Sequence, residues 1–578
     1  MVRDIARGLA ERGRKGTVPL TTYLIPSRVP TSDGTPLEST APDGLEGEFD
    51  DHIDPRFPVH TATNTSEALP GPLTPMTLDL HMGALRIGNE TMGRMIALDG
   101  VALEQWASRV CSVLGHHVYI NASIGVLVAE NMPGWDEESI RKDAYGNIPD
   151  EIPLQPHGKP PMPTGLASVR ATWRAVSRVI ATARRYRESA ERINQASCAE
   201  TLTATAIAGL TDEQLHTNAL LWRDRLNQAW TVASIGVMMT GAATAIHARG
   251  KGGQVNVDPR RLESARTMLA VERLAALLRD DPALLTLAES GDVDTLRTAS
   301  PTFADALDTE LAAIGHRGPG ECELINPTFG DNPAMLVGAA ARAARQDAPD
   351  RAPGEEPTSR TARMAVGATV ARERARDGVV RYTHCLRLAL RERARRLAKA
   401  GALAETDDVF FLTLDEAFCL PADATERVAR RRAERERLRG IRMPDIVVGR
   451  WEPVGDSAQL GAGGSLTGIG VCAGVVEGRV KRVLSLDDDV EPGDILVASV
   501  TDTGHTAMFA YASAVVTDIG GAASHAAIVA REFGIPCVVD TKNATTSLCD
   551  GQLVRVDGAA GTVTVIADST TQEETAAV

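Results

Sequence analysis

The chain has 578 residues, of which 43% are hydrophobic and 24% are charged. These values exclude a disordered or fibrous protein, and the length predicts two to four domains of roughly 150 residues. The formal net charge of −15, from 61 basic and 76 acidic residues, disfavours nucleic acid and anionic membranes as partners.

The eight cysteines are scattered, without a C-x-x-C pair or zinc spacing, which is typical of reduced thiols inside the cell. The chain begins Met1-Val2-Arg3-Asp4 and lacks the apolar segment of a secretory signal. An uncharged stretch from Ala229 to Ile246 approaches the length of a membrane span, but threonine, serine and glycine interrupt it, which favours a buried helix. We therefore expect a cytoplasmic protein.

Residues 1–55 are expected to form an N-terminal extension or linker, because the part from 27 to 55 is rich in Pro, Ser, Thr, Asp and Gly and has no apolar period. Residues 56–455 are predicted to form a large, mainly helical domain. Apolar residues at spacings of four, three and four define one helix face: Val169, Trp173, Val176 and Ile180. Similar amphipathic runs occur at 211–248, 259–279, 358–400 and 424–440.

Arginine and glutamate dominate the segment Arg427 to Arg439, which indicates a solvated helix face with i,i+4 ion pairs. Further on, Gly461 to Ser465 reads G-A-G-G-S, a composition that leaves the backbone unconstrained. Residues 456–468 are therefore expected to be a flexible linker between two domains.

Residues 469–568 change to short β-rich runs separated by turn signals, and a short tail, 569–578, follows. The predicted strands lie at 475–483, 495–500, 514–517, 536–539, 553–556 and 562–566, and two helices at 506–512 and 525–533. The fold class is thus multidomain α and α/β, a large helical domain followed by a small α/β domain.

A single histidine, His525, stands at a chemically favourable position in this small domain. A strand ends at Thr517, Gly520 and Gly521 allow a sharp turn, and Ser524 is a favoured N-cap residue. The free N–H groups and the dipole of the helix start favour an anion there, and a neutral imidazole can accept a phosphoryl group. On spacing alone, a capping or core histidine is still the favoured interpretation.

The segment from Gly520 to Pro536, G-G-A-A-S-H-A-A-I-V-A-R-E-F-G-I-P, resembles the phosphohistidine signature of the phosphoenolpyruvate-utilising enzymes. The resemblance implies a swivelling β/β/α domain that carries phosphate on His525. It also implies catalytic positions at Ser524, Gly520, Gly521 and Arg531.

Other segments are similar to the rifampin phosphotransferase branch of this family. Those resembling its substrate domain are Asn64 to Thr74, Gly315 to Leu324 and Asp407 to Leu412. Gly474 to Gly478 resembles the opening strand of its phosphohistidine domain. Thr501 to Phe509 resembles its strand-to-helix turn, although His505 and Ala507 replace an aromatic residue and a proline. The likeness covers most of residues 60 to 566.

Full-length relatives charge the histidine with an ATP-grasp domain, for which residues 1–55 offer no room, and no Walker A loop is present. The resemblance therefore implies a separate ATP-grasp subunit that binds ATP and Mg²⁺, with no cofactor bound to this chain alone. The pyruvate-binding barrel of other relatives is also missing, so phosphoenolpyruvate is not expected as a substrate.

The polar segment at 316–323 is the candidate acceptor site. Arg317 could steady the phosphoryl oxygens, His316 could accept the hydroxyl proton, and Glu321 could orient either one. Glu323 completes the cluster. The alternative is that Arg317 and Glu321 form a structural ion pair that closes a loop.

Two further groups are candidates for binding the acceptor. Trp230, Met238 and Met239 could line an apolar pocket, although core packing is the favoured interpretation. Arg387 and Arg391 lie one helical turn apart and could guide the phosphate, with a solvated helix face as the alternative.

The sequence thus predicts a phosphotransferase component that passes phosphate from His525 to a hydroxyl of a small, largely apolar acceptor. One alternative is a dehydratase or condensing enzyme in which the phosphate is a leaving group. Another is a non-catalytic phospho-relay or regulatory protein.

Overall fold

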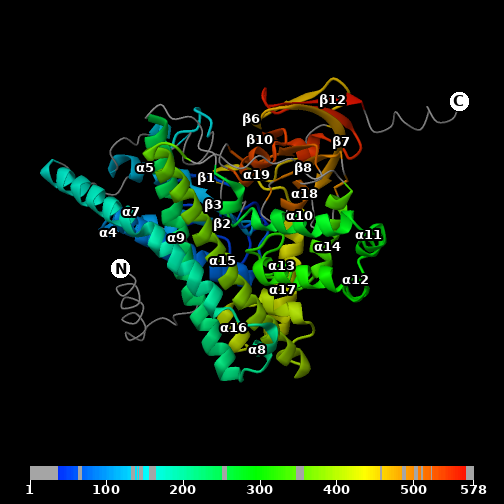
Figure 1. Ribbon diagram of the computed structural model, residues 1–578. Helices are drawn as coiled ribbons and strands as arrows, with labels where there is room; N and C mark the ends of the chain where they lie inside the picture. Colours follow the sequence, from blue (N-terminus) through cyan, green and yellow to red (C-terminus); the bar gives the residue numbers. More distant parts are fainter. Residues whose placement is uncertain are drawn as a thin grey trace.

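The computed structural model has a helical body and a β-rich domain (Figure 1). It describes residues 37–62, 68–131, 137–139, 141, 148–154, 165–249, 257–345, 357–455, 459–483, 490–491, 493–499, 501, 506–509, 512–521 and 524–567.

Long helices form the centre of the helical body: α3 (Pro75–Met95), α7 (Leu166–Glu200), α9 (Asp212–Arg249) and α15 (Arg360–Lys399). α15 packs along α9 and α7, and α9 also packs along α3. The three helices α3, α9 and α15 are joined at His81, whose Nδ1 accepts a 3.0 Å hydrogen bond from Trp230 Nε1 and whose Nε2 lies 3.4 Å from Thr383 Oγ1. Burial lowers the pKa of His81 to about 3, so this imidazole is neutral.

By length and composition, α9 is apolar enough to cross a membrane. It nevertheless supplies the core of the helical body with Trp222, Leu226, Ala229, Ile235 and Met239. The helix predicted at 229–246 is therefore present as part of a longer helix, but it is buried on one side only, since Val237 and Ile246 are exposed.

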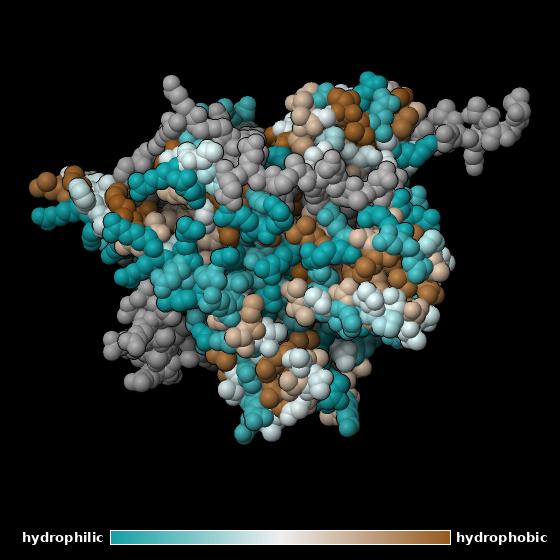
Figure 2. All heavy atoms as spheres, in the orientation of Figure 1, coloured by the Kyte–Doolittle hydropathy of each residue, from teal (hydrophilic) through white to brown (hydrophobic). Residues whose placement is uncertain are grey.

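The apolar face predicted on α7 is mostly uncovered. Val169, Trp173 and Ile180 are exposed, as is Leu166 at the start of the helix. The outer end of α7 projects from the body, and Figure 2 shows hydrophobic surface there. The sequence thus predicted the helix and its apolar face, but it did not predict that this face is exposed.

A small antiparallel sheet within the helical body was missed by sequence reasoning. Its order is β2-β3-β1-β4, with β1 (Val59–Thr61), β2 (Cys111–Leu114), β3 (His117–Asn121) and β4 (Ile446–Val448). The strands are three to five residues long, too short for a period of two to be recognised. Short helices α4 (Gly100–Arg109), α5 (Ala122–Asn131) and α6 (Glu137–Ser139) accompany it.

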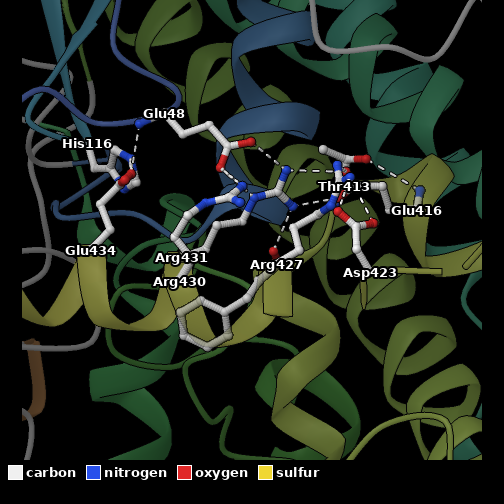
Figure 3. Close-up of polar contacts among 10 residues, drawn as sticks. Glu48, His116, Thr413, Glu416, Asp423, Arg427, Arg430, Arg431 and Glu434 are labelled. Atoms are coloured by element: carbon white, nitrogen blue, oxygen red, sulfur yellow. Dashed lines mark hydrogen bonds and ion pairs between the residues drawn. The ribbon is translucent and has the colours of Figure 1, made fainter. Parts of the chain in front are cut away.

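The last part of the predicted N-terminal extension packs on the helical body. Phe49 and Ile53 are buried, and Glu48 accepts hydrogen bonds from Arg430 and Arg431 of α17 (Ala424–Arg439) (Figure 3). The segment 37–55 has no helix or strand, as its loop-like composition predicts, but it is packed on the body and is therefore not a linker. Its polar composition reflects pairing with charges almost 400 positions away.

The predicted solvated face of α17 needs a similar correction. Arg427 does pair with Asp423 at i,i+4, but Arg431 is buried and bonds to Glu48 and Glu416 from other segments (Figure 3). The charged residues of α17 thus form ion pairs with distant segments as well as within the helix.

A second group of helices follows: α10 (Arg266–Arg279), α11 (Pro282–Glu289), α12 (Val293–Ala299), α13 (Pro301–Ile314) and α14 (Pro333–Ala344). Three of them begin at a side-chain N-cap: Asp281, Asp292 and Ser300. The remaining short elements are α8 (Ala204–Ala208), η3 (Pro259–Arg261), η4 (Thr406–Phe411) and α16 (Leu414–Phe418).

The C-terminal domain is built on eight strands in the order β5-β12-β11-β7-β8-β9-β10-β6. The strands are β5 (Ser465–Thr467), β6 (Ile469–Cys472), β7 (Val475–Val483), β8 (Ile495–Ala498), β9 (Ala514–Thr517), β10 (Cys537–Val539), β11 (Leu553–Asp557) and β12 (Thr562–Ala567). The six predicted strands are present. β5 begins inside the predicted linker, because Leu466 is buried and its backbone pairs with β12.

The neighbours β7, β8, β9 and β10 are parallel, and helices cover both faces, as parallel strands require. α18 (Thr506–Phe509) and α19 (His525–Phe533) share one hydrophobic core with α10 and α14. α20 (Ala544–Ser547) covers the opposite face. The α19 face of the sheet is thus the one that meets the second group of helices.

Candidate functional site

His525 is the first residue of α19, directly after the N-cap Ser524. The Ser524 Oγ atom accepts a 3.2 Å hydrogen bond from the Ala527 backbone N–H, so the helix start predicted from the sequence is confirmed. Because α19 follows β9, His525 stands at the carboxyl end of a parallel strand, where ligands bind in open α/β sheets. The dipole and the free N–H groups of α19 favour an anion at this place.

The turn before α19 has no room for a side chain at its first glycine. Gly520 has φ of +153°, and a Cβ atom there would lie 3.2 Å from Ser524 Oγ and 3.2 Å from Val539 Cβ. The second glycine, Gly521, meets no such contact, and its carbonyl accepts a hydrogen bond from Ser524 N–H. Gly520 therefore allows close packing against Ser524 and Val539, whereas Gly521 takes part in the turn that leads into α19.

The other end of α19 is fixed by Gly534, a left-handed C-cap with φ of +68°. Ala526, Val529 and Ala530 are buried on the sheet, while Arg531 in the last turn is only partly buried. Arg531 therefore follows His525 by six residues, nearly two helical turns. Ala522, Ala523, Asp502 to His505, Asn64 to Glu67 and the side chain of His525 lie outside the described residues.

The predicted polar cluster of the helical body lies between α13 and α14 and is buried against α15. His316 Nε2 is 3.0 Å from Asp377 Oδ1, and Arg317 Nη2 donates to the same oxygen at 2.7 Å. Burial lowers the pKa of His316 to about 4 although Asp377 opposes the change. Burial alone would raise the pKa of Asp377, but His316 and Arg317 hold it well below its usual range.

Arg317 also pairs with Glu321 at 3.3 Å, and both side chains are almost fully buried. This is the structural ion pair that the sequence left open as an alternative. Two carboxylates already share the Arg317 guanidinium, so Arg317 in this arrangement holds the loop to α15.

Glu323 and Arg387 also hold this loop. Glu323 accepts hydrogen bonds from Thr74 N–H, Thr74 Oγ1 and Thr77 Oγ1 at the start of α3. Arg387 donates to the Leu324 carbonyl at 3.0 Å and forms an ion pair with Asp331. Burial lowers the pKa of Arg387 to about 10. Neither residue lies on a solvated helix face.

The remaining predicted acceptor residues lie in two places. Met239 is buried in the core of α3, α9 and α15, and the partly buried Trp230 and Met238 pack against that core, the arrangement that the sequence favoured. The Arg391 guanidinium lies 6.0 Å from the Phe410 ring centroid, and its buried Nε has no hydrogen-bond partner among the described residues. Arg387 Nη2 is likewise buried without a hydrogen-bond partner among the described residues. Both arginines predicted to guide phosphate therefore keep donor capacity, but Arg387 is already tied to Leu324 and Asp331.

Sequence reasoning missed His384, which lies on α15 one turn before Arg387. Its buried Nδ1 has no hydrogen-bond partner in the described part of the chain. Burial and the nearby His316 lower its pKa to about 3. The only available signal was its spacing of seven from Asp377 along one helix, which places both residues on the same face.

Two protein-family models match the chain. The mobile domain of phosphoenolpyruvate-utilising enzymes matches residues 490–561, and the fourth domain of rifampicin phosphotransferase matches residues 230–400. The first contains the β9–α19 turn and the second contains the cluster around Asp377. The candidate site is thus divided between the two matched regions.

Among curated relatives, an uncharacterized protein of Mycobacterium tuberculosis is 39% identical over 589 residues, covering 96% of this chain and 68% of the relative. The rifampicin phosphotransferase of Streptomyces sviceus is 30% identical over 297 residues, covering 45% of this chain and 34% of that enzyme. The Bacillus subtilis rifampicin phosphotransferase is 32% identical over 200 residues, which is 34% of this chain and 23% of the enzyme.

The fold and the β9–α19 turn define a protein with a phosphohistidine-type mobile domain. With these relatives, the chain belongs to the phosphoenolpyruvate-utilising enzyme family, in the branch related to rifampicin phosphotransferase. Among solved structures, the NMR solution structure of an Enzyme I (nEIt) protein matches over 56% of this chain and 88% of that chain, at 17% identity and a TM-score of 0.14.

Proposed function

We propose that the chain is a phosphotransferase component in which His525 carries the phosphoryl group. The observation that carries this proposal is the place of His525, as the first residue of a capped helix at the carboxyl end of a parallel strand. The rifampicin phosphotransferases among the relatives support phosphoryl transfer as the general chemistry. In our proposal, a separate ATP-grasp subunit that binds ATP and Mg²⁺ charges the histidine.

In the charging step, an imidazole nitrogen of His525 attacks a phosphorus atom of ATP. For attack at the γ-phosphorus, a P–N bond forms, the bridging P–O bond of ATP breaks, and ADP leaves with the electron pair on its terminal oxygen. The N-terminus of α19 stabilises the transferred negative charge. Ser524 and the two glycines act by positioning this helix start.

In the discharge step, a hydroxyl oxygen of a small, largely apolar acceptor attacks the phosphorus and the P–N bond breaks. We assign the hydroxyl proton to His316. Its Nε2 faces the Asp377 carboxylate, which orients the ring and leaves Nδ1 as the acceptor. Arg391 would steady the phosphoryl oxygens. Asp377 is a positioning residue.

The test is to incubate the chain with its ATP-grasp subunit and with ATP labelled at the β- or γ-phosphate. Acid-labile label is expected on the wild type and on a His216→Ala control, and none on His525→Ala. Equal labelling of wild type and His525→Ala would contradict the proposal.

Product analysis with a labelled chain and a hydroxylated metabolite pool then identifies the net reaction. A stable phosphate ester is the expected product. An alkene or a coupled product with free phosphate would instead show that the phosphate is a leaving group.

A further inference from the structure

A cavity of about 290 Å³ lies outside the cluster around Asp377, where α7, η3, α10 and α15 meet. Five arginines line it, together with a single carboxylate: Arg187, Arg260, Arg261, Arg266, Arg374 and Glu263. This concentration of positive charge stands out in a chain with a net charge of −15.

Neighbouring carboxylates neutralise only part of this charge. Arg260 pairs with Asp258 at 2.6 Å, Arg266 pairs with Glu263 at 2.7 Å, and Arg374 pairs with Glu191.

The side chains of the other two arginines, Arg187 and Arg261, form no ion pair or hydrogen bond with any described residue. Arg261 has only a Coulombic interaction with Asp258, which already pairs with Arg260, so an anion between the two guanidinium groups would be attracted by both. The cavity therefore has donor groups and charge available for a ligand.

Arg187 is held in place by a glycine on the facing helix. A Cβ atom at Gly367 would lie 3.0 Å from Arg187 Cζ and 3.2 Å from each of its Nη atoms. The guanidinium thus rests directly on the α15 backbone. Glycine inside a helix costs about 1 kcal/mol relative to alanine, and here it makes space for the arginine.

The cavity also lies next to the buried cluster around Asp377. Glu263 is buried, and burial together with the Asp377 charge raises its pKa. The next residue, Ser264, donates its backbone N–H to Glu373 of α15 at 3.3 Å. One short segment therefore forms both the wall of the cavity and a contact with the helix that carries Asp377.

We propose that this cavity binds a small phosphate-bearing anion, a phosphate ester or a condensed phosphate, with Arg187 and Arg261 as its main ligands. Guanidinium groups bind phosphate oxygens in a bidentate manner. A volume at the lower end of the usual range for ligand pockets, roughly 300–1,000 Å³, fits a small anion better than a large cofactor. The proposal does not depend on the role of His525.

The experiment is calorimetric titration of the full chain with inorganic pyrophosphate and, separately, with phenyl phosphate, at constant ionic strength. Wild type is expected to bind at least one of the two probes. The double variant Arg187→Ala/Arg261→Ala is expected to bind the same probe at least tenfold more weakly. Gly367→Ala is also expected to lower the affinity, because its Cβ atom would displace Arg187. Tighter binding of phenyl phosphate identifies an ester site, and tighter binding of pyrophosphate a condensed-phosphate site.

The matched control is Arg184→Ala/Arg185→Ala, which removes two exposed arginines of the same helix outside the cavity. It is expected to retain wild-type affinity. Absence of binding to both probes in wild type, or equal loss of affinity in the control and the cavity variant, would overturn the proposal. Thermal unfolding of each variant verifies that the compared proteins are folded.

Discussion

At the scale of single residues, Glu48 shows how a charge in an apparent linker stabilises the fold. Burial opposes its ionised form, but the hydrogen bonds from Arg431 and Arg430 lower its pKa from 4.5 to about 2. A lowered carboxyl pKa means that the stabilisation is fully present above pH 4.5 and is lost as the pH falls towards 2.

We therefore expect Glu48→Gln to reduce the free energy of unfolding by about 1–3 kcal/mol at pH 7, because it leaves the buried Arg431 with fewer charged partners. Thermal or urea unfolding at pH 7 and at pH 3 measures the difference, which should shrink at the lower pH. Glu436→Gln, on the exposed side of α17, is the control. An equal effect at both pH values would contradict this assignment.

His316 gives a second prediction at this scale. His316→Asn is expected to slow discharge of the phosphoryl group to the acceptor by about 10²–10⁴-fold, the usual contribution of a general base. The rate at which His525 becomes labelled should not change, because charging takes place elsewhere. Single-turnover assays of the pre-labelled chain separate the two steps, and slower labelling would show a merely structural effect.

The residues of the site could be predicted from the sequence to different degrees. Ser524, His525 and the two glycines are consecutive in the chain, so a local pattern was sufficient. The partners of His316, Arg317 and Arg387 could not be found in this way, because Asp377 and Asp331 lie on other elements about 60 positions away.

At the scale of elements, the start of α19 depends on one serine side chain. Ser524→Ala is expected to destabilise the protein by about 1 kcal/mol, since the Ala527 N–H loses its cap. It should also slow labelling of His525 by loosening the first helical turn. Melting temperature and labelling rate are the measurements.

Thr203→Ala is the matched control, because Thr203 caps α8 with the same 3.2 Å geometry. It should cost similar stability and leave labelling unchanged. If both variants label at the same rate, the cap of α19 has no part in the reaction.

Elements with a strong period were predicted closely, as α15 and β7 show. The sheet β1–β4 was not, since it joins segments near 60, 115 and 447, and pairing over such distances leaves no local signal. The apolar face predicted on α7 is mostly exposed, because periodicity defines a helix face but does not tell what lies opposite it.

At the scale of the whole molecule, Arg442 connects the two parts of the chain. Its guanidinium donates to Thr546 Oγ1 at 2.7 Å and to the Lys542 carbonyl at 2.5 Å, and lies 3.6 Å from Asp518. Arg442→Ala is therefore expected to shift the population towards an undocked domain. An increase in the radius of gyration, measured by small-angle X-ray scattering, checks this.

Arg450→Ala is the control, because Arg450 lies in the same connecting segment and its ion pairs with described residues are to exposed carboxylates. It should leave the scattering curve unchanged. An unchanged curve for Arg442→Ala would show that the core shared by α10, α18 and α19 is sufficient to keep the domain docked.

The connection between the two parts also sets the kind of movement that is possible. Val454 N–H is bonded to the Arg442 carbonyl on the helical side, and Leu460 N–H to the Ser547 carbonyl on the sheet side. Only residues 455 to 459 separate these anchors, and the Cα atoms of Val454 and Leu460 can be at most about 20 Å apart. The domain can therefore rotate about a nearly fixed pivot but cannot translate far. The active site that phosphorylates His525 would therefore have to lie at a position that the start of α19 reaches when the domain rotates about this pivot.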